Sequence, residues 1–255
     1  MPAQQTTDKL LYRTPNLHGQ SPGLLVVEST RHGGVSPAPY ASLNLGNSPA
    51  DAPENVAENR ARFWQSLGVS AGQVATSHQV HGAEVLMVTQ AGHFEGYDAL
   101  ITRQRGIVLA VTIADCTPVL LYDTRQQAVA AIHAGWRGTV QEIVFKTLQK
   151  MQQEFGTDPA DCFAYIGTCI DECSFEVGDE VAGQFSPAHK WFNERAGKYY
   201  VDLKKANRDQ LLRAGLTTDR IELSPFSTVL DNQDFFSYRL AGGHTGRMLA
   251  CIGVL

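Results

Sequence analysis

The chain has 255 residues, 43% of them apolar, and a net charge of −5. This length suits one large globular domain or two small ones, and neither an internal repeat nor a linker-like run divides it. The acidic balance and the scattered basic residues give no reason to expect nucleic acid as a partner.

The amino-terminal residues and the cysteines point to one compartment. Met1–Gln5 is polar and lacks the apolar core of a signal peptide, and the apolar stretch Ile107–Ala114 is too short to span a bilayer. Five cysteines, an odd number without a secretion signal, argue against a disulfide framework. We therefore expect a cytoplasmic protein with no membrane partner.

The first half of the chain predicts strands around one long helix. Continuous apolar runs are typical of buried strands, and apolar residues spaced three and four apart are typical of a helix face. In chain order we expect a strand over Gly23–Glu28, a glycine-rich loop over Ser29–Ser36, a helix over Asp51–Leu67, and strands over Glu84–Thr89 and Gly106–Ile113. Pro53 near the start of the helix and Gly68 after it support its boundaries.

The second half mixes strands and helices in the same way. In chain order we expect a hairpin of Pro118–Tyr122 and Ala128–Ile132, a helix over Thr139–Phe155, strands over Phe163–Gly167 and Lys198–Val201, a helix over Asp202–Leu212 and a terminal strand over Arg247–Gly253. Thr139 or Gly138 is expected as an N-cap. Because strict βαβ alternation is absent, we expect an α/β or α+β fold with a mixed or largely antiparallel sheet. Residues 1–22 are expected to be an N-terminal extension, and residues 23–255 a single catalytic domain.

Three segments place chemically active side chains at predicted strand ends, namely His78–Gly82, Asp115–Cys116 and His133–Gly138. Two histidines and a cysteine that converge there can hold a zinc ion with one coordination position open. The two histidines of the first segment point to opposite faces if that segment is extended. We take His81 as the ligand because Gly82 beside it lets the backbone approach closely.

The same residues can form a hydrolytic pair instead. Cys116 would then be the nucleophile and His133 the base, with Asp115 or His81 orienting the histidine. A zinc-binding protein without turnover is a further alternative, which an open coordination position opposes because structural zinc sites are usually closed. Two histidines and a cysteine also suit copper. The sequence has no His-x-His pair of the kind that multicopper oxidases use, so copper polyphenol oxidase chemistry is disfavoured.

Motifs in these segments and beyond them resemble those of one family. Gln79–Gly82, Ala114–Val119 and His133–Gly138 are similar to the three signature segments of the YfiH-like family, formerly labelled "multicopper polyphenol oxidase, laccase domain". Further similar segments, in family order, are Ser29–Ser36, Tyr40–Gly46, Glu58–Arg60, Phe175–Val177, Phe235–Arg239 and Thr245–Arg247. The chain departs from the family at Thr168, where the family commonly has proline.

The resemblance implies an α/β/β/α layered sandwich with mixed sheets and the activity of a purine nucleoside phosphorylase. It implies zinc bound by His81, Cys116 and His133. It also implies phosphorolysis of adenosine, inosine, guanosine and methylthioadenosine, with adenosine deamination in the same site. The family's fold is similar to that of cysteine-dependent deamidases, so a Cys–His hydrolase, including one that edits a peptidoglycan precursor, stays open as an alternative.

Phosphorolysis requires a phosphate ion beside the ribose, and arginine side chains and glycine amides are typical phosphate ligands. We expect the catalytic residues to be Cys116, His133, Asp115 and Arg137. We expect substrate and phosphate to be bound by Arg31, Gly33, Gly34, Asn44 and Arg137. The expected partners are small molecules, a nucleoside and phosphate, and we expect a monomer.

Overall fold

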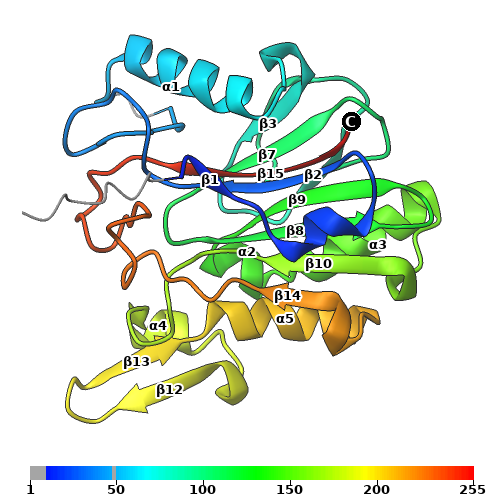
Figure 1. The fold of residues 1–255 in the computed structure, drawn as a ribbon. Helices are drawn as coiled ribbons and strands as arrows, with labels where there is room; N and C mark the ends of the chain where they lie inside the picture. Colours follow the sequence, from blue (N-terminus) through cyan, green and yellow to red (C-terminus); the bar gives the residue numbers. More distant parts are fainter. Residues whose placement is uncertain (1–9, 48–49) are drawn as a thin grey trace, which may run out of the picture.

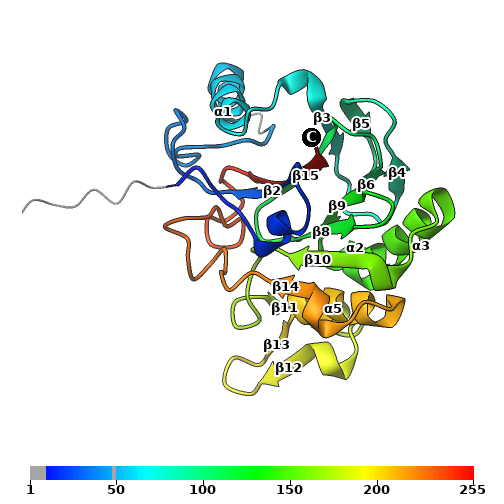
Figure 2. The same cartoon turned by 45° about the vertical axis from the view of Figure 1, so that its right-hand side comes forward.

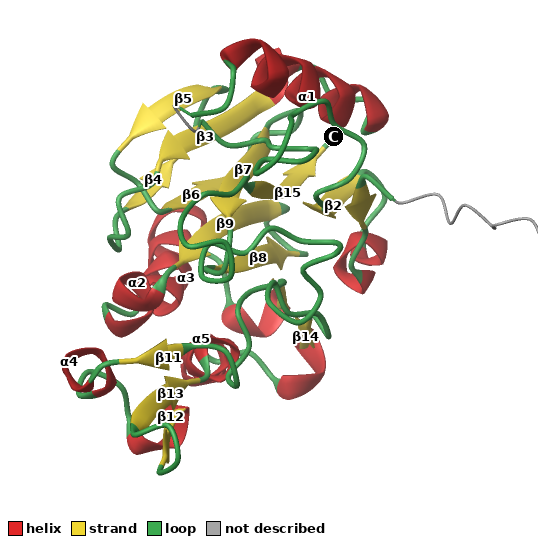
Figure 3. Ribbon diagram, turned by 90° about the vertical axis from the view of Figure 1, so that its left-hand side faces the viewer, coloured by secondary structure: helices red, strands yellow, loops and turns green. Residues whose placement is uncertain are grey.

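Two six-stranded mixed sheets pack face to face in the computed structural model, which describes residues 10–47 and 50–255 (Figures 1 and 2). The first sheet has the strand order β1 (Tyr12–Arg13), β2 (Leu24–Ser29), β15 (Met248–Val254), β7 (Val108–Ile113), β3 (Val74–His78) and β5 (Gly92–Glu95). The second has the order β14 (Ile221–Leu223), β10 (Cys162–Ile166), β8 (Thr117–Asp123), β9 (Ala128–Ala134), β6 (Ala99–Thr102) and β4 (Val85–Met87). A small third sheet, β11 (Glu176–Val177), β13 (Lys198–Val201) and β12 (Lys190–Asn193), lies at one end of the molecule (Figure 3).

Helices cover the outer faces of both large sheets (Figure 1). The helices of the described residues are α1 (Pro53–Ser66), α2 (Trp136–Val140), α3 (Ile143–Phe155), α4 (Asp179–Ala182) and α5 (Leu203–Ala214). Phe63 of α1 packs on the first sheet, and Leu148 of α3 packs on the second. Val111 and Leu120 belong to a core cluster between the two sheets. The layer order of helix, sheet, sheet and helix confirms the predicted α/β/β/α sandwich.

Most predicted strands are present with slightly different ends. The expected hairpin is confirmed as β8 and β9, in which Thr117 lies opposite Ala134 and Asp123 lies opposite Ala128. The helix expected over Asp202–Leu212 is α5, and the side chain of Asp202 caps it. None of the helices within the described ranges is long and apolar enough to cross a membrane.

One expected helix is two helices. The helix predicted over Thr139–Phe155 begins earlier, since Gly135 is the N-cap of α2. It is then interrupted at Glu142, whose φ of 63° is left-handed. The predicted N-cap at Thr139 or Gly138 is therefore wrong.

A side chain from another helix stabilises this interruption. Gln210 of α5 is buried, and its Nε2 donates to the carbonyl of Thr139. Its Oε1 accepts from the N–H groups of Val144 and Phe145. The amide thus replaces hydrogen bonds that an unbroken helix would make. Such a tertiary contact leaves no local signal in the sequence of residues 139–155.

Part of the segment predicted as an N-terminal extension belongs to the fold. Tyr12–Arg13 pairs antiparallel with β2, with Tyr12 opposite Ser29. Leu17, in the short turn Asn16–Gln20, is buried in the core cluster between the sheets. The ordered domain therefore starts before residue 23.

Thr168 is held in a way that proline could not reproduce. Its N–H donates to Oε1 of the fully buried Glu28 over 2.8 Å, and its hydroxyl donates to Oε2 over 2.7 Å. Proline has no N–H to donate. Two residues further on, the N–H of Ile170 donates to the carbonyl of Asp115. The departure from the family pattern thus anchors a loop beside the predicted site.

Candidate metal centre

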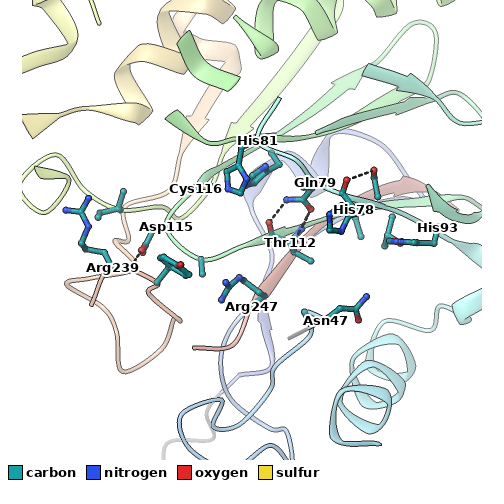
Figure 4. Close-up of a pocket in the computed structure, with 18 of the residues that line it drawn as sticks. Asn47, His78, Gln79, His81, His93, Thr112, Asp115, Cys116, Arg239 and Arg247 are labelled. Atoms are coloured by element: carbon teal, nitrogen blue, oxygen red, sulfur yellow. Dashed lines mark hydrogen bonds between the residues drawn. The ribbon is translucent and has the colours of Figure 1, made fainter. Parts of the chain in front are cut away.

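Three side chains from segments of both large sheets meet at one point. One ligand atom each of His81, Cys116 and His133 lies within 4.8 Å of the other two. His81 follows β3 and has a φ of 60°, Cys116 lies in the bend between β7 and β8, and His133 lies near the end of β9. Figure 4 shows His81 and Cys116 side by side at the cleft. The structure therefore brings together the three residues predicted as metal ligands and leaves His78 outside the group, as expected.

A buried aspartate that the sequence analysis missed organises this cluster. Oδ1 of Asp98 lies 2.7 Å from Nδ1 of His133, and the Asp98 side chain is fully buried. The carboxylate also accepts hydrogen bonds from the N–H groups of Val80, His81 and Gly82. Asp98 thus holds both the imidazole of one ligand and the loop of another.

The charge on Asp98 keeps a proton on Nδ1 of His133. Burial opposes the charge, but the hydrogen bonds from His133 and from the loop amides outweigh it and lower the pKa of Asp98. A carboxylate only accepts hydrogen bonds, so Nδ1 of His133 carries the proton. Nε2 is then directed at the cluster, which is the arrangement that carboxylates impose on metal-binding histidines.

Cys116 and His133 stabilise each other's charged forms. Burial alone would raise the pKa of Cys116, but the charge of His133 and hydrogen bonds from both histidines lower it to about 6. Burial likewise opposes the charge on His133, but the thiolate and the carboxylate of Asp98 raise its pKa to about 9. At neutral pH the metal-free site therefore holds a thiolate beside an imidazolium.

Glycines bring the backbone of the His133–Gly138 segment close to the ligands. A Cβ at Gly135 would lie 3.1 Å from Cδ2 of His81 and 3.2 Å from Sγ of Cys116. A Cβ at Gly138 would lie 2.8 Å from the carbonyl oxygen of Gly82. The glycine-rich turn after β9 is thus required for close packing around the ligand cluster.

The cluster lies in a cleft of about 590 Å³. Polar side chains of Gln79 and Thr112 line its floor and bond each other, since Nε2 of Gln79 donates to the Thr112 carbonyl and Oε1 accepts from its N–H. Phe175 and Tyr238 provide aromatic surface. The size suits a small molecule such as a nucleoside, because ligand pockets are typically about 300–1,000 Å³.

Asp115 lines the cleft, but it does not orient a histidine. Its Oδ1 accepts from the hydroxyl of Thr228, and its Oδ2 accepts from the N–H of Arg239. Its φ of 83° is unusual for a residue other than glycine. Asp115 therefore ties the bend before Cys116 to the loop after β14. The carboxylate that hydrogen-bonds His133 is that of Asp98, whereas the hydrolase alternative named Asp115 or His81 for this role.

The residues expected to bind phosphate lie outside the cleft lining. The guanidinium of Arg31 donates to the carbonyls of Ala41 and Asn232. Gly34 packs so closely against the Ser42 carbonyl that a Cβ would clash with it. Arg137 is exposed, with its guanidinium 4.5 Å from the ring centre of Trp136.

The other two expected phosphate ligands, Gly33 and Asn44, contact other parts of the protein instead of the cleft. Gly33 has a φ of 86° and packs against Leu11. Asn44 is fully buried and hydrogen-bonds Asp51.

The arginines that do line the cleft are Arg60, Arg239 and Arg247. The sequence signal for Arg60 and Arg247 was their place in the Glu58–Arg60 and Thr245–Arg247 motifs. The signal for Asp98 was an acidic residue directly before the buried run Ala99–Thr102.

The fold and the cleft define an α/β enzyme with a histidine–cysteine cluster that could bind a metal ion, and comparisons with known proteins place the chain among enzymes. A family model described as "Multi-copper polyphenol oxidoreductase laccase" matches residues 25–255. A "Purine nucleoside phosphorylase" of Deinococcus radiodurans is 42% identical over 246 residues, covering 96% of this chain and 92% of that protein. "Adenosine deaminase RL5" of an unknown prokaryotic organism is 34% identical over 224 residues, covering 82% and 85%. The crystal structure of the Bacillus licheniformis hypothetical protein YfiH has a TM-score of 0.91 and 29% identity, covering 97% and 98%.

The chain belongs to this laccase-domain family, which is the YfiH-like family that its motifs resemble. It is an enzyme.

Proposed function

We propose that the chain is a zinc-dependent purine nucleoside phosphorylase that also deaminates adenosine. The proposed substrates are adenosine, inosine, guanosine and methylthioadenosine, together with phosphate. The observation that carries the proposal is the His81, Cys116 and His133 cluster in a cleft of nucleoside size. The names of the relatives, a purine nucleoside phosphorylase and an adenosine deaminase, support the substrate class.

The donor set fits zinc. Two imidazole nitrogens and one thiolate are ligands that zinc prefers, and three protein ligands leave a position for water or substrate. The thiolate is already favoured at Cys116, and the hydrogen bond of Asp98 to Nδ1 of His133 leaves Nε2 as the nitrogen that would bind a metal once its proton is displaced. When bound, zinc would supply a Lewis acid that polarises a substrate oxygen or acidifies a water molecule.

The chain's own residues bind and orient the substrate. Phe175 and Tyr238 offer flat apolar faces against which a purine can stack. The Gln79–Thr112 pair fixes the segment that leads to His81. The concave cleft removes part of the substrate from water, which strengthens every polar contact within it.

The second candidate is a Cys–His hydrolase, including one that acts on a peptidoglycan precursor. It is favoured by the lowered pKa of Cys116 beside the raised pKa of His133, with Asp98 as the third member. That arrangement activates a thiol without any metal. The two candidates differ in their response to chelation, because the hydrolase keeps its activity after metal removal and the zinc enzyme loses it.

Incubation of metal-loaded protein with adenosine, with and without phosphate, tests the proposed function. We expect adenine and ribose 1-phosphate only when phosphate is present, and inosine whether or not it is present. A chelator should abolish both reactions, and added zinc should restore them. If metal-loaded protein forms none of these products, the proposal is wrong.

Zinc binding should release about one proton per metal ion near pH 7.5. Between pH values of about 6 and about 9, the Cys116–His133 pair holds one proton, and that proton is on His133. The metal needs the neutral imidazole, so binding displaces this proton. Below a pH of about 6 the thiol is protonated as well, and zinc affinity should fall more steeply.

Calorimetric titration in buffers of different ionisation enthalpy measures this count. A binding enthalpy that does not depend on the buffer near neutral pH would contradict the ion pair.

A further inference from the structure

We propose that Arg247, with Arg60 beside it, forms the subsite for inorganic phosphate in this cleft, and that the buried Asn44–Gly46 segment positions it. This inference rests on the proposed function, and it replaces the phosphate ligands expected from the sequence with residues that line the cleft. Figure 4 shows Arg247 across the cleft from His81 and Cys116.

The two guanidinium groups keep free donors in the cleft. In Arg247, Nη1 donates to the carbonyls of Thr245 and Gly246, which leaves Nε and Nη2 without a protein partner among the described residues. In Arg60, Nε and Nη2 both donate to the carbonyl of Leu45, which leaves Nη1. Free N–H groups on a fork of fixed shape match the oxygens of a phosphate.

Neither charge is neutralised by the protein. Within residues 10–47 and 50–255, no carboxylate forms an ion pair with Arg60 or Arg247. Burial lowers the pKa of both arginines, so holding these charges in the cleft costs solvation that an anion would recover. Arg239, the third arginine of the cleft, also forms no ion pair, but both of its Nη atoms donate to backbone carbonyls, those of Ser174 and Glu176, so that only Nε stays free.

Arg247 lies close enough to the histidine–cysteine cluster to interact with it electrostatically. Burial lowers the pKa of Arg247, and the neighbouring Tyr238, Cys116 and Asp115 only partly offset that shift. Its guanidinium also lies 5.2 Å from the ring centre of Tyr238. An anion on Arg247 would therefore lie beside the aromatic surface and within electrostatic reach of the ligand cluster, where phosphorolysis requires it.

The Asn44–Gly46 segment is built around Arg247. Oδ1 of Asn44 accepts from the N–H groups of Gly46 and Arg247, over 3.1 and 2.9 Å, and the N–H of Leu45 donates to the Arg247 carbonyl. A Cβ at Gly46 would lie 2.5 Å from Cγ and 2.6 Å from Cβ of Arg247. Only glycine lets the arginine stem cross at this point.

Asn44 is fixed in turn by a buried polar network. Its Nδ2 donates to Asp51, and the side chain of Asn59 donates to its carbonyl. Asp51 also accepts from the hydroxyl of Ser36. Asn44, with Asp51 and Asn59 behind it, therefore acts through Arg247 as a positioning residue rather than as a phosphate ligand.

Phosphate binding to zinc-loaded protein, followed by calorimetry and by phosphorus NMR without nucleoside, tests this subsite directly. Arg247→Gln should raise the Kd for phosphate about 10- to 100-fold, because it removes a charge-assisted pair of hydrogen bonds. The amount of bound zinc and the Kd for inosine, measured without phosphate, should each change by less than about twofold, which is small beside the expected change in the Kd for phosphate. Arg125→Gln, in the exposed β8–β9 turn, is the control and should bind phosphate as the wild type does.

Further variants separate position from charge. Gly46→Ala keeps both arginines and should still weaken phosphate binding, whereas the exposed Gly19→Ala should not. Thermal unfolding of each variant shows whether it folds. Adenosine 5′-monophosphate serves as a second probe, which distinguishes binding of inorganic phosphate from binding of a nucleotide's phosphate group. A variant that loses the nucleotide and keeps inorganic phosphate would overturn the assignment.

The subsite and the proposed function can fail separately. Phosphate that binds through Arg247 in a protein without nucleoside turnover supports the subsite and refutes the function. Phosphate-dependent turnover with an unchanged phosphate Kd and KM in Arg247→Gln refutes the subsite and supports the function. Loss of phosphate binding in Arg137→Gln instead would return the site to the α2 segment and overturn the proposal.

Discussion

Cys116→Ala should lose bound metal and all nucleoside turnover. The substitution removes the only sulfur of the ligand group, and two imidazoles alone hold zinc weakly. We expect zinc affinity to fall at least about 100-fold, which exceeds the typical cost of losing an outer-shell partner. Elemental analysis after dialysis, together with the phosphorolysis rate, measures both effects.

Cys173→Ala is the matched control for this loss. Cys173 is an exposed thiol that does not belong to the ligand group, so its variant should keep metal and activity. A Cys116→Ala protein that is folded, inactive and fully metal-loaded would contradict the zinc account and favour the thiol hydrolase.

Asp98→Asn should lower zinc affinity about 10- to 100-fold, the usual cost of losing the carboxylate behind a metal-binding histidine. The aspartate accepts from His133 Nδ1 and from three loop amides, and an asparagine has one acceptor oxygen and a new donor at this buried point. We also expect the free energy of unfolding to fall by about 1–3 kcal/mol, because buried donors lose their partner. Competition with a chromophoric chelator gives the first quantity, and denaturant unfolding gives the second.

The chain offers a second aspartate–histidine pair as a control. Oδ2 of Asp209 in α5 lies 2.7 Å from Nε2 of His189, and neither residue belongs to the ligand group or lines its cleft. Asp209→Asn should leave zinc affinity unchanged. If Asp98→Asn binds zinc as tightly as the wild type does, Asp98 does not orient the ligand.

The sequence allowed the ligand group to be predicted because each ligand follows or ends an apolar run with a glycine nearby. His81, Cys116 and His133 lie at such points, and the packing of Gly135 against two of them explains the association. The layered fold was likewise predictable from strands whose apolar runs are continuous, since both large sheets are covered on both faces.

The features that the sequence did not predict depend on contacts between residues far apart in the chain. Asp98 lies thirty-five positions before His133, and only the pairing of β6 with β9 brings them together. The interruption before α3 depends on Gln210, sixty-six positions beyond Val144. Such contacts have no periodic pattern in the sequence, so the predicted helix was too long and the orienting carboxylate was missed.

Which arginines line the cleft was hidden from the sequence for the same reason. Arg31 and Arg137 lie in glycine-rich segments typical of anion sites, but Arg31 bonds backbone carbonyls and Arg137 is exposed over its neighbouring tryptophan. Arg247 reaches the cleft because it crosses Gly46, two hundred positions earlier in the chain. Which arginine keeps free donors is decided by backbone carbonyls that the sequence does not reveal.

X-ray absorption at the zinc and copper edges of protein purified without added metal tests the central claim most directly. The account predicts stoichiometric zinc with one sulfur at about 2.3 Å and two nitrogen neighbours at about 2.0–2.1 Å, together with a light atom from water. A shell without sulfur, copper in place of zinc, or protein that is active without stoichiometric metal would contradict it.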